Sequence, residues 1–187
     1  MNEIDRQLAH LNIGLLMLAT LWLFGQVWAA AAAFSLLLGF MLLSYYAKHH
    51  AKKSGTLSCA LWSLLSLFER RGANHFEGAI WYSAGLLLPL SILPYPEQAA
   101  AAVFILAVGD SASTLFGLHG KRKLPYNPKK TMLGTFAFFV FSSISVAIAG
   151  WMALVASAVC ALVESLELGI DDNITVSLAA TALLFAL

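Results

Sequence analysis

Residues 99–131 read AAAAVFILAVGDSASTLFGL (99–118) followed by HGKRKLPYNPKKT (119–131), and this stretch decides the fold class. The first part is an apolar segment long enough to cross a bilayer, and it carries one carboxylate, Asp110. The second part, the basic loop, has five Lys or Arg residues and two prolines, so it does not continue the helix. An ionisable side chain in a membrane span is costly and indicates a functional site. The position of Asp110 next to a basic loop favours a site that holds a metal ion and a polyphosphate at the membrane surface.

The composition indicates a membrane protein. Apolar residues make up 60% of the chain and charged residues 11%, far from the values of soluble globular proteins. We expect an all-α, polytopic membrane bundle of about six or seven transmembrane helices, in one domain covering 1–187. The apolar segment 56–68 is short for a crossing and predicts an interfacial or re-entrant helix. The predicted spans are 10–27, 29–47, 79–93, 99–118, 132–149, 151–165 and 173–187.

The positions of the charges predict the topology. With these spans, all eleven Lys and Arg residues fall on one face of the membrane, and Glu97 is the one charged residue on the other. The positive-inside rule places the basic face in the cytoplasm. Three polar segments then meet there, namely 69–77, 110–131 and 164–173. A charged aqueous substrate would reach them from the cytosol, and a lipid substrate would enter sideways between helices.

The basic loop and its neighbours form the predicted nucleotide and phosphate site. Lysines supply positive charge, glycines allow close backbone approach, and the N-terminus of the following helix favours an anion. The segment is not a P-loop, because Leu115 and Arg122 stand where that motif has Gly and Ser or Thr. A simpler interpretation of the lysines is a topology anchor. The candidate residues are Ser111, Gly117, Gly120, Lys121, Lys123, Lys129, Lys130 and Thr131.

The acidic segment, 164–173, holds four carboxylates at a membrane boundary. Magnesium in nucleotide sites takes one or two carboxylates together with phosphate oxygens. The alternative is a solvated loop in which Asp172 or Asn173 caps the last helix. The predicted catalytic residues are Asp110, Asp171 and Asp172. The predicted metal ligands are Asp110, Glu164, Asp171, Asp172, Asn173 and Glu77.

A third polar segment, 69–77, could add to the same site. Arg70 and Arg71 could clamp phosphates, while a boundary loop with paired charges is the alternative. Arg6 and His10 mark the start of the first span, where His10 is interpreted as a helix-start polar residue rather than a catalyst.

The run GDSASTLFGLHGKRKLPYNPKKTMLGT (109–135) resembles the signature of the CTP-dependent lipid kinases. These include dolichol or polyprenol kinase, phytol kinase and yeast-type diacylglycerol kinase, and are distant relatives of CDP-diacylglycerol synthase. The resemblance covers nearly the whole chain, although Leu133 stands where the family commonly has an acidic residue. Similar flanking segments are RQLAH (6–10), ERRG (69–72), EGAIWY (77–82), VE (163–164) and IDDN (170–173).

The resemblance implies transfer of the γ-phosphate of CTP to a membrane lipid alcohol, with Mg²⁺ or another divalent cation. The short chain favours a polyprenol- or dolichol-type kinase of a prokaryotic cytoplasmic membrane, with its active site facing the cytoplasm. The residues leave two alternatives open, a cytidylyltransferase acting on a lipid phosphate and a non-enzymatic anion-handling membrane protein. The expected partners are the lipid alcohol, CTP and the bilayer, without nucleic acid, and a homo-oligomer is left open.

Overall fold

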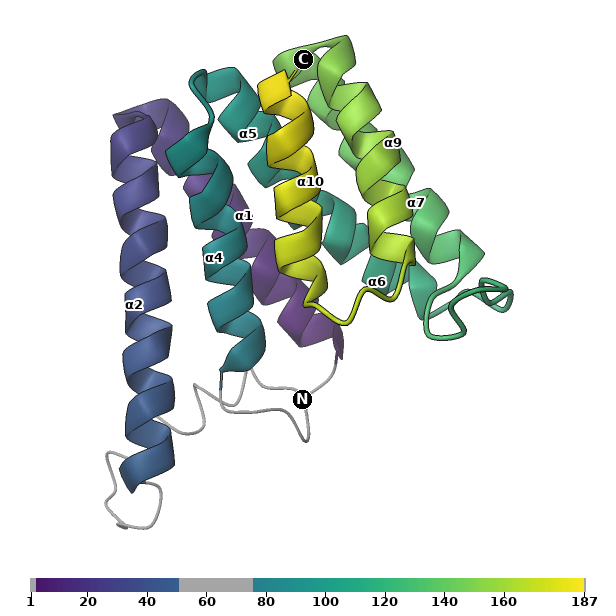
Figure 1. Ribbon diagram of the computed structural model, residues 1–187, viewed down its shortest axis with the longest axis horizontal. Coiled ribbons are helices and arrows are strands. Elements are labelled where there is room, and N and C mark those ends of the chain that lie inside the picture. The colour runs from purple at the N-terminus through teal and green to yellow at the C-terminus, as the bar shows by residue number, and fades with distance from the viewer. Residues whose placement is uncertain (1–2, 51–75, 187) are drawn as a thin grey trace.

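The computed structural model describes residues 3–50 and 76–186, and within these ranges the regular structure is helical apart from one isolated bridge. Figure 1 shows the helices side by side, with successive helices of the described ranges running up and then down the bundle. They are α1 (Glu3–Phe24), α2 (Gln26–His50), α4 (Glu77–Ile92), α5 (Pro96–Phe104), the π-helix η2 (Ile105–Gly109), α6 (Asp110–Gly117), α7 (Met132–Ser142), the 3₁₀ helix η3 (Ser143–Ser145), α8 (Val146–Ala149), α9 (Trp151–Ser165) and α10 (Asp172–Ala186).

The all-helical prediction is confirmed for this part of the chain, and each of the seven predicted spans corresponds to a helix or a continuous helical run. Four of them are long and apolar enough to cross a membrane: Glu3–Phe24, Gln26–Tyr46, Pro96–Gly117 and Met132–Ala149. The helices α9 and α10 are apolar but shorter. The count of six or seven crossings therefore stays a prediction. The segment 56–68, Arg70 and Arg71 lie outside the described residues.

The run α5–η2–α6 forms the centre of the bundle. It contacts α1, α4, α9 and α10, and Ala99 to Ala102 in α5 are buried. Small side chains let helix backbones approach closely, which is a main source of helix association in a bilayer. The approach is close at Gly14 of α1, where an added Cβ would lie 2.2 Å from the Cβ of Ala107.

The outer surface of the bundle is apolar. Leu16, Leu23, Phe136 and Phe185 each leave more than half of their side chain exposed. An extended surface of this kind marks contact with a membrane or a partner. Leu16, Leu23 and Phe136 lie on helical runs of membrane-spanning length, and Phe185 lies on the shorter α10. These side chains are therefore suited to face lipid.

The two ends of the bundle differ in charge. In Figure 1, α1, α4, α7 and α10 begin at the lower end, and α6 and α9 finish there. The described part of the chain has Arg6 and the whole basic loop at this end, whereas Glu97 lies at the start of α5 at the other. The structure thus places the basic residues and Glu97 at opposite ends of the bundle, as the predicted spans do. Which end faces the cytoplasm stays a prediction.

A π-helix directly precedes Asp110. Such helices are usually single-turn insertions within α-helices and are frequent at functional sites. The extra residue in the turn changes which face α6 presents relative to α5. Gly109, the last residue of η2, packs against the ring of Phe138, since an added Cβ would lie 2.8 Å from a ring carbon.

Candidate active site

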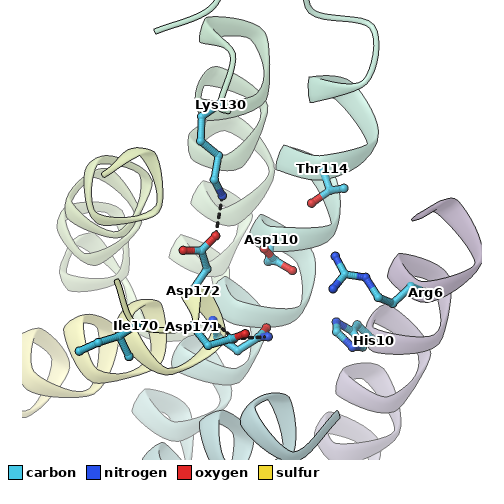
Figure 2. Close-up of a pocket in the computed structure, with 9 residues that line it drawn as sticks. Arg6, His10, Asp110, Thr114, Lys130, Ile170, Asp171 and Asp172 are labelled. Carbon is cyan, nitrogen blue, oxygen red and sulfur yellow. Dashed lines mark hydrogen bonds and ion pairs between the residues drawn. The ribbon is translucent and has the colours of Figure 1, made fainter. Parts of the chain in front are cut away.

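A polar cavity of about 170 Å³ lies at the charged end of the bundle. Figure 2 shows that side chains from α1, α6, the basic loop and the start of α10 point toward one another around it. Segments far apart in the sequence therefore converge on one pocket. Its lining residues are Arg6, His10, Asp110, Thr114, Lys130, Ile170, Asp171, Asp172 and Asn173.

Lys130 joins the basic loop to the acidic segment. Its Nζ lies 2.5 Å from Oε1 of Glu164, in the last turn of α9, and 2.7 Å from Oδ2 of Asp172, at the start of α10. Ser113 of α6 also donates to Oε1 of Glu164, at 2.6 Å. Burial lowers the pKa of Lys130, but the charges of Glu164 and Asp172 outweigh it and hold the pKa above its ordinary value. Lys130 is therefore an ammonium ion at neutral pH.

Asp110 lies between two walls of the pocket, with Asp172 and Lys130 on one side and Arg6 on the other (Figure 2). Its side chain is buried, and the side-chain amide of Gln7, in α1, lies next to it. In the amide orientation that satisfies all neighbours, Gln7 donates to Oδ2 of Asp110 at 3.3 Å and accepts from Thr114 at 3.0 Å and Arg6 at 3.3 Å. Predicted Ser111 instead donates to the backbone oxygen of Gln7, at 3.3 Å, and does not line the pocket.

The first turns of α1 contribute a cation and an imidazole. Arg6 is buried and forms an ion pair with Glu3. The ring of His10 stacks on that of Tyr82, with centroids 4.2 Å apart, and the Tyr82 hydroxyl donates to the backbone oxygen of His10 at 2.6 Å. His10 is thus buried in the pocket wall, a more specific position than the helix-start role predicted for it.

Asp171 caps α10. Its Oδ1 accepts hydrogen bonds from the backbone N–H of Asn173 at 3.0 Å and from the Asn173 side-chain amide at 2.8 Å. This is the geometry of an N-cap residue. The capping alternative for the acidic segment is therefore realised, but at Asp171 rather than at Asp172 or Asn173.

Three of the predicted phosphate-binding lysines do not line the pocket. Lys121 and Lys123 are exposed, and Lys129 is an exposed partner of Glu167. Asn127 fastens the loop to the end of α9 by donating to the backbone oxygen of Ser165 at 3.0 Å. Lys130 is thus the basic-loop lysine that the fold turns into the pocket.

The predicted glycines and Thr131 pack the base of the loop. An added Cβ at Gly120 would lie 2.6 Å from Oγ1 of Thr131, and the N–H of Gly120 donates to the oxygen of Gly117 at 3.0 Å. Thr131 caps α7 by accepting from the N–H of Gly134 at 3.1 Å. These contacts give the three residues a shaping role. Their contact with a phosphate stays a prediction.

The predicted metal ligands are only partly brought together. Across residues 3–46 and 76–186, no group of three or more His, Cys, Asp or Glu side chains is arranged to hold a metal ion. Glu77 opens α4 and does not line the pocket. However, Oε2 of Glu164 and Oδ1 of Asn173 are buried without a hydrogen-bond partner in the described chain. Oxygen donors of this kind fit a divalent cation whose remaining ligands come from phosphates and water.

Gln7 and Thr114 were not singled out from the sequence. Thr114 follows Asp110 by four residues, so it lies on the same face of α6 and could have been found from that spacing. Gln7 gives no comparable signal, because its role depends on how α1 packs against α6.

No family model matches the chain, and no solved structure matches it significantly. It is 28% identical over 177 residues to the uncharacterized protein MJ1137 of Methanocaldococcus jannaschii, covering 93% of this chain and 88% of that protein. It is 27% identical over 150 residues to CTP-dependent diacylglycerol kinase 1 of Eremothecium gossypii, covering 79% of this chain. The match spans 46% of that kinase, so this chain is distantly similar to about half of a CTP-dependent lipid kinase.

Proposed function

We propose that this protein is a CTP-dependent lipid kinase, which transfers the γ-phosphate of CTP to the hydroxyl group of a membrane lipid alcohol. The supporting observation is the pocket, in which cations from α1 and the basic loop surround carboxylates from α6 and α10 at the end of an apolar bundle. The distant similarity to a lipid kinase supports the same reaction.

Arg6 and Lys130 bind the phosphate chain in this proposal. They lie on opposite sides of Asp110 (Figure 2), so a polyphosphate between them would meet positive charge from two walls. Phosphoryl transfer depends mainly on positioning and charge neutralisation, which these side chains supply. The other predicted phosphate residues within the described ranges would shape the loop or add positive charge near the pocket: Ser111, Gly117, Gly120, Lys121, Lys123, Lys129 and Thr131. Arg70 and Arg71 lie outside the described residues, and their role stays a prediction.

Glu164, Asp172 and Asn173 would hold the divalent cation, with Asp171 keeping the start of α10 in place. When bound, the cation neutralises charge on the β- and γ-phosphate oxygens. Asp110 accepts the proton of the lipid hydroxyl as its oxygen bonds to the γ-phosphorus and the bond to the β-phosphate oxygen breaks, releasing CDP. The Gln7 amide holds Asp110 in the orientation this transfer needs.

The lipid acceptor enters from the bilayer along α6 and α7. Phe116 and Phe136 are exposed on these helices, and the rings of Phe116 and Phe141 pack with centroids 5.2 Å apart. We favour a polyprenol- or dolichol-type alcohol, one of the substrate classes that the resemblance of 109–135 implies. The kinase relative is named for diacylglycerol, and an apolar groove discriminates weakly between tails.

The test incubates purified protein with CTP, Mg²⁺ and one lipid at a time: a polyprenol, dolichol, phytol or diacylglycerol. The expected result is phosphorylated polyprenol or dolichol, formed with CTP and not with ATP. Phosphorylation of diacylglycerol alone would overturn the substrate class and keep the reaction. Absence of a phosphorylated product from every alcohol, with folded protein, would overturn the kinase proposal.

A further inference from the structure

The proposed reaction has Lys130 bind phosphates, although in the structure Lys130 is already paired with carboxylates. Its ammonium group lies between two carboxylates from different helices, at 2.5 Å from Glu164 and 2.7 Å from Asp172. The Glu164 side chain is completely buried, whereas that of Asp172 is 39% exposed. The same ammonium group lines the pocket in which the phosphate chain would bind.

The Lys130 ammonium cannot pair with its carboxylates and with the phosphates at the same time. If it turned toward phosphates and nothing replaced it, Glu164 would become a buried carboxylate without a cation, which is strongly unfavourable. The incoming nucleotide is itself an anion, and it approaches a pocket lined by Asp110, Asp171 and Asp172. A second positive charge must therefore arrive with the nucleotide.

Two further oxygen atoms indicate that this second positive charge is a divalent cation. Oε2 of Glu164 and Oδ1 of Asn173 are buried and have no hydrogen-bond partner within the described residues. Both side chains are more than nine-tenths buried, and Asn173 lines the pocket. Carboxylate and amide oxygens are ligands of hard divalent cations. The Lys130 ammonium has three N–H donors, and these leave the two oxygens named above without a partner.

We infer that the Lys130 ammonium stands in the place of a divalent cation between Glu164 and Asp172 in the ligand-free protein, and that it transfers to the phosphates when the metal–nucleotide complex binds. This inference rests on the proposed function for the nucleotide, but its metal site belongs to the chain alone. No bond to Lys130 is made or broken other than its ion pairs.

The exchange couples the binding of metal and nucleotide. A free divalent cation must displace a tethered ammonium from its carboxylates. A free nucleotide must draw that ammonium away from a buried carboxylate. When both ligands bind, the phosphates pair with the displaced Lys130 ammonium, and the cation pairs with the carboxylates that Lys130 has left. The metal–nucleotide complex therefore binds more tightly than the separate affinities of the two ligands predict.

The test measures binding of Mn²⁺ alone to the full chain in a nonionic detergent, by electron paramagnetic resonance, without nucleotide or lipid. Lys130→Gln removes the tethered cation, and we expect Mn²⁺ affinity to increase about tenfold or more relative to the unchanged protein. Arg122→Gln removes an exposed cation from the same loop and is expected to leave the affinity unchanged. Equal affinities for Lys130→Gln and the unchanged protein would overturn the inference.

A second variant covers the case in which Lys130→Gln does not fold. Asp172→Asn leaves Lys130 paired with Glu164, and we expect it to weaken binding of the Mn²⁺–CTP complex about tenfold. Asp5→Asn, an exposed acid of α1, is the control and should have no effect. Unchanged binding in Asp172→Asn would contradict the site. Neither measurement needs a lipid or turnover, so this inference and the kinase proposal fail on different results.

Discussion

Asp110 is held in the pocket by neighbours that its local sequence does not contain. In the amide orientation that satisfies all its neighbours, Gln7 of α1 donates to Asp110 and accepts from Thr114 and Arg6. The sequence could identify Asp110, because a carboxylate in an apolar run is conspicuous on its own. It could not identify Gln7, because that contact joins residues more than a hundred positions apart.

We expect Asp110→Asn to lower turnover by about 100-fold or more, since an amide cannot accept the proton of the acceptor hydroxyl. The change is nearly isosteric, so thermal unfolding should stay close to that of the unchanged protein. The measurement is initial rate against CTP concentration, with Asp5→Asn, an exposed acid of α1, as the control. Turnover of Asp110→Asn within a few-fold of this control would reject the role of Asp110.

We expect Arg6→Gln to raise the KM for CTP about tenfold, because one of the two cations facing the phosphate chain is lost. The kcat should change less if Arg6 mainly binds the ground state. Arg122→Gln makes the same charge change outside the pocket and should leave the KM unaltered. Equal KM values for the two variants would show that Arg6 does not bind the nucleotide.

At the scale of elements, hydropathy predicted the helices well and their irregularities poorly. The predicted span 99–118 corresponds to the continuous run Pro96–Gly117, and 151–165 matches α9. The π-helix at Ile105–Gly109 gave no signal, because its hydrogen-bonding register depends on how neighbouring helices pack against it. The basic loop was found from its prolines and charges, but the selection of Lys130 over Lys121 depends on the docking of the loop against α9.

The crossing of α1 over the central run depends on Gly14. Gly14→Ala would bring its methyl group within 2.2 Å of the Ala107 Cβ, and we expect a loss of about 1–3 kcal/mol in stability. Adding Ala107→Gly should recover much of that loss. Gly39→Ala is the control, since nothing lies within 4 Å of an added Cβ there. Thermal unfolding in detergent measures all four proteins, and equal stability of the Gly14 and Gly39 variants would contradict the packing.

At the scale of the molecule, the site exists because helix ends from the whole described chain meet at one end of the bundle. Charge counting predicted that 110–131 and 164–173 share a face, and the structure brings Lys130 into contact with Glu164 and Asp172. It could not predict which side chains meet, because a topology specifies a face of the membrane and not a rotation about each helix axis.

The orientation of the bundle can be tested with single cysteines in a variant lacking Cys59 and Cys160. Lys123→Cys should react with an impermeant thiol reagent only from the cytoplasmic side, as the positive-inside rule predicts. Glu97→Cys, at the opposite end, should react only from outside. Labelling of Lys123→Cys from outside would invert the topology and place the pocket away from cytosolic CTP.

The fate of the phosphorus atoms tests the central proposal most directly. Purified protein is given either a polyprenol or a lipid phosphate, with Mg²⁺ and CTP labelled at either the γ- or the α-phosphate, and the lipid extract is counted. The proposal predicts that γ-label enters the lipid, that α-label stays in the aqueous phase as CDP, and that Asp110→Asn suppresses the transfer. Incorporation of α-label, with a lipid phosphate as acceptor and release of pyrophosphate, would contradict it and identify a cytidylyltransferase.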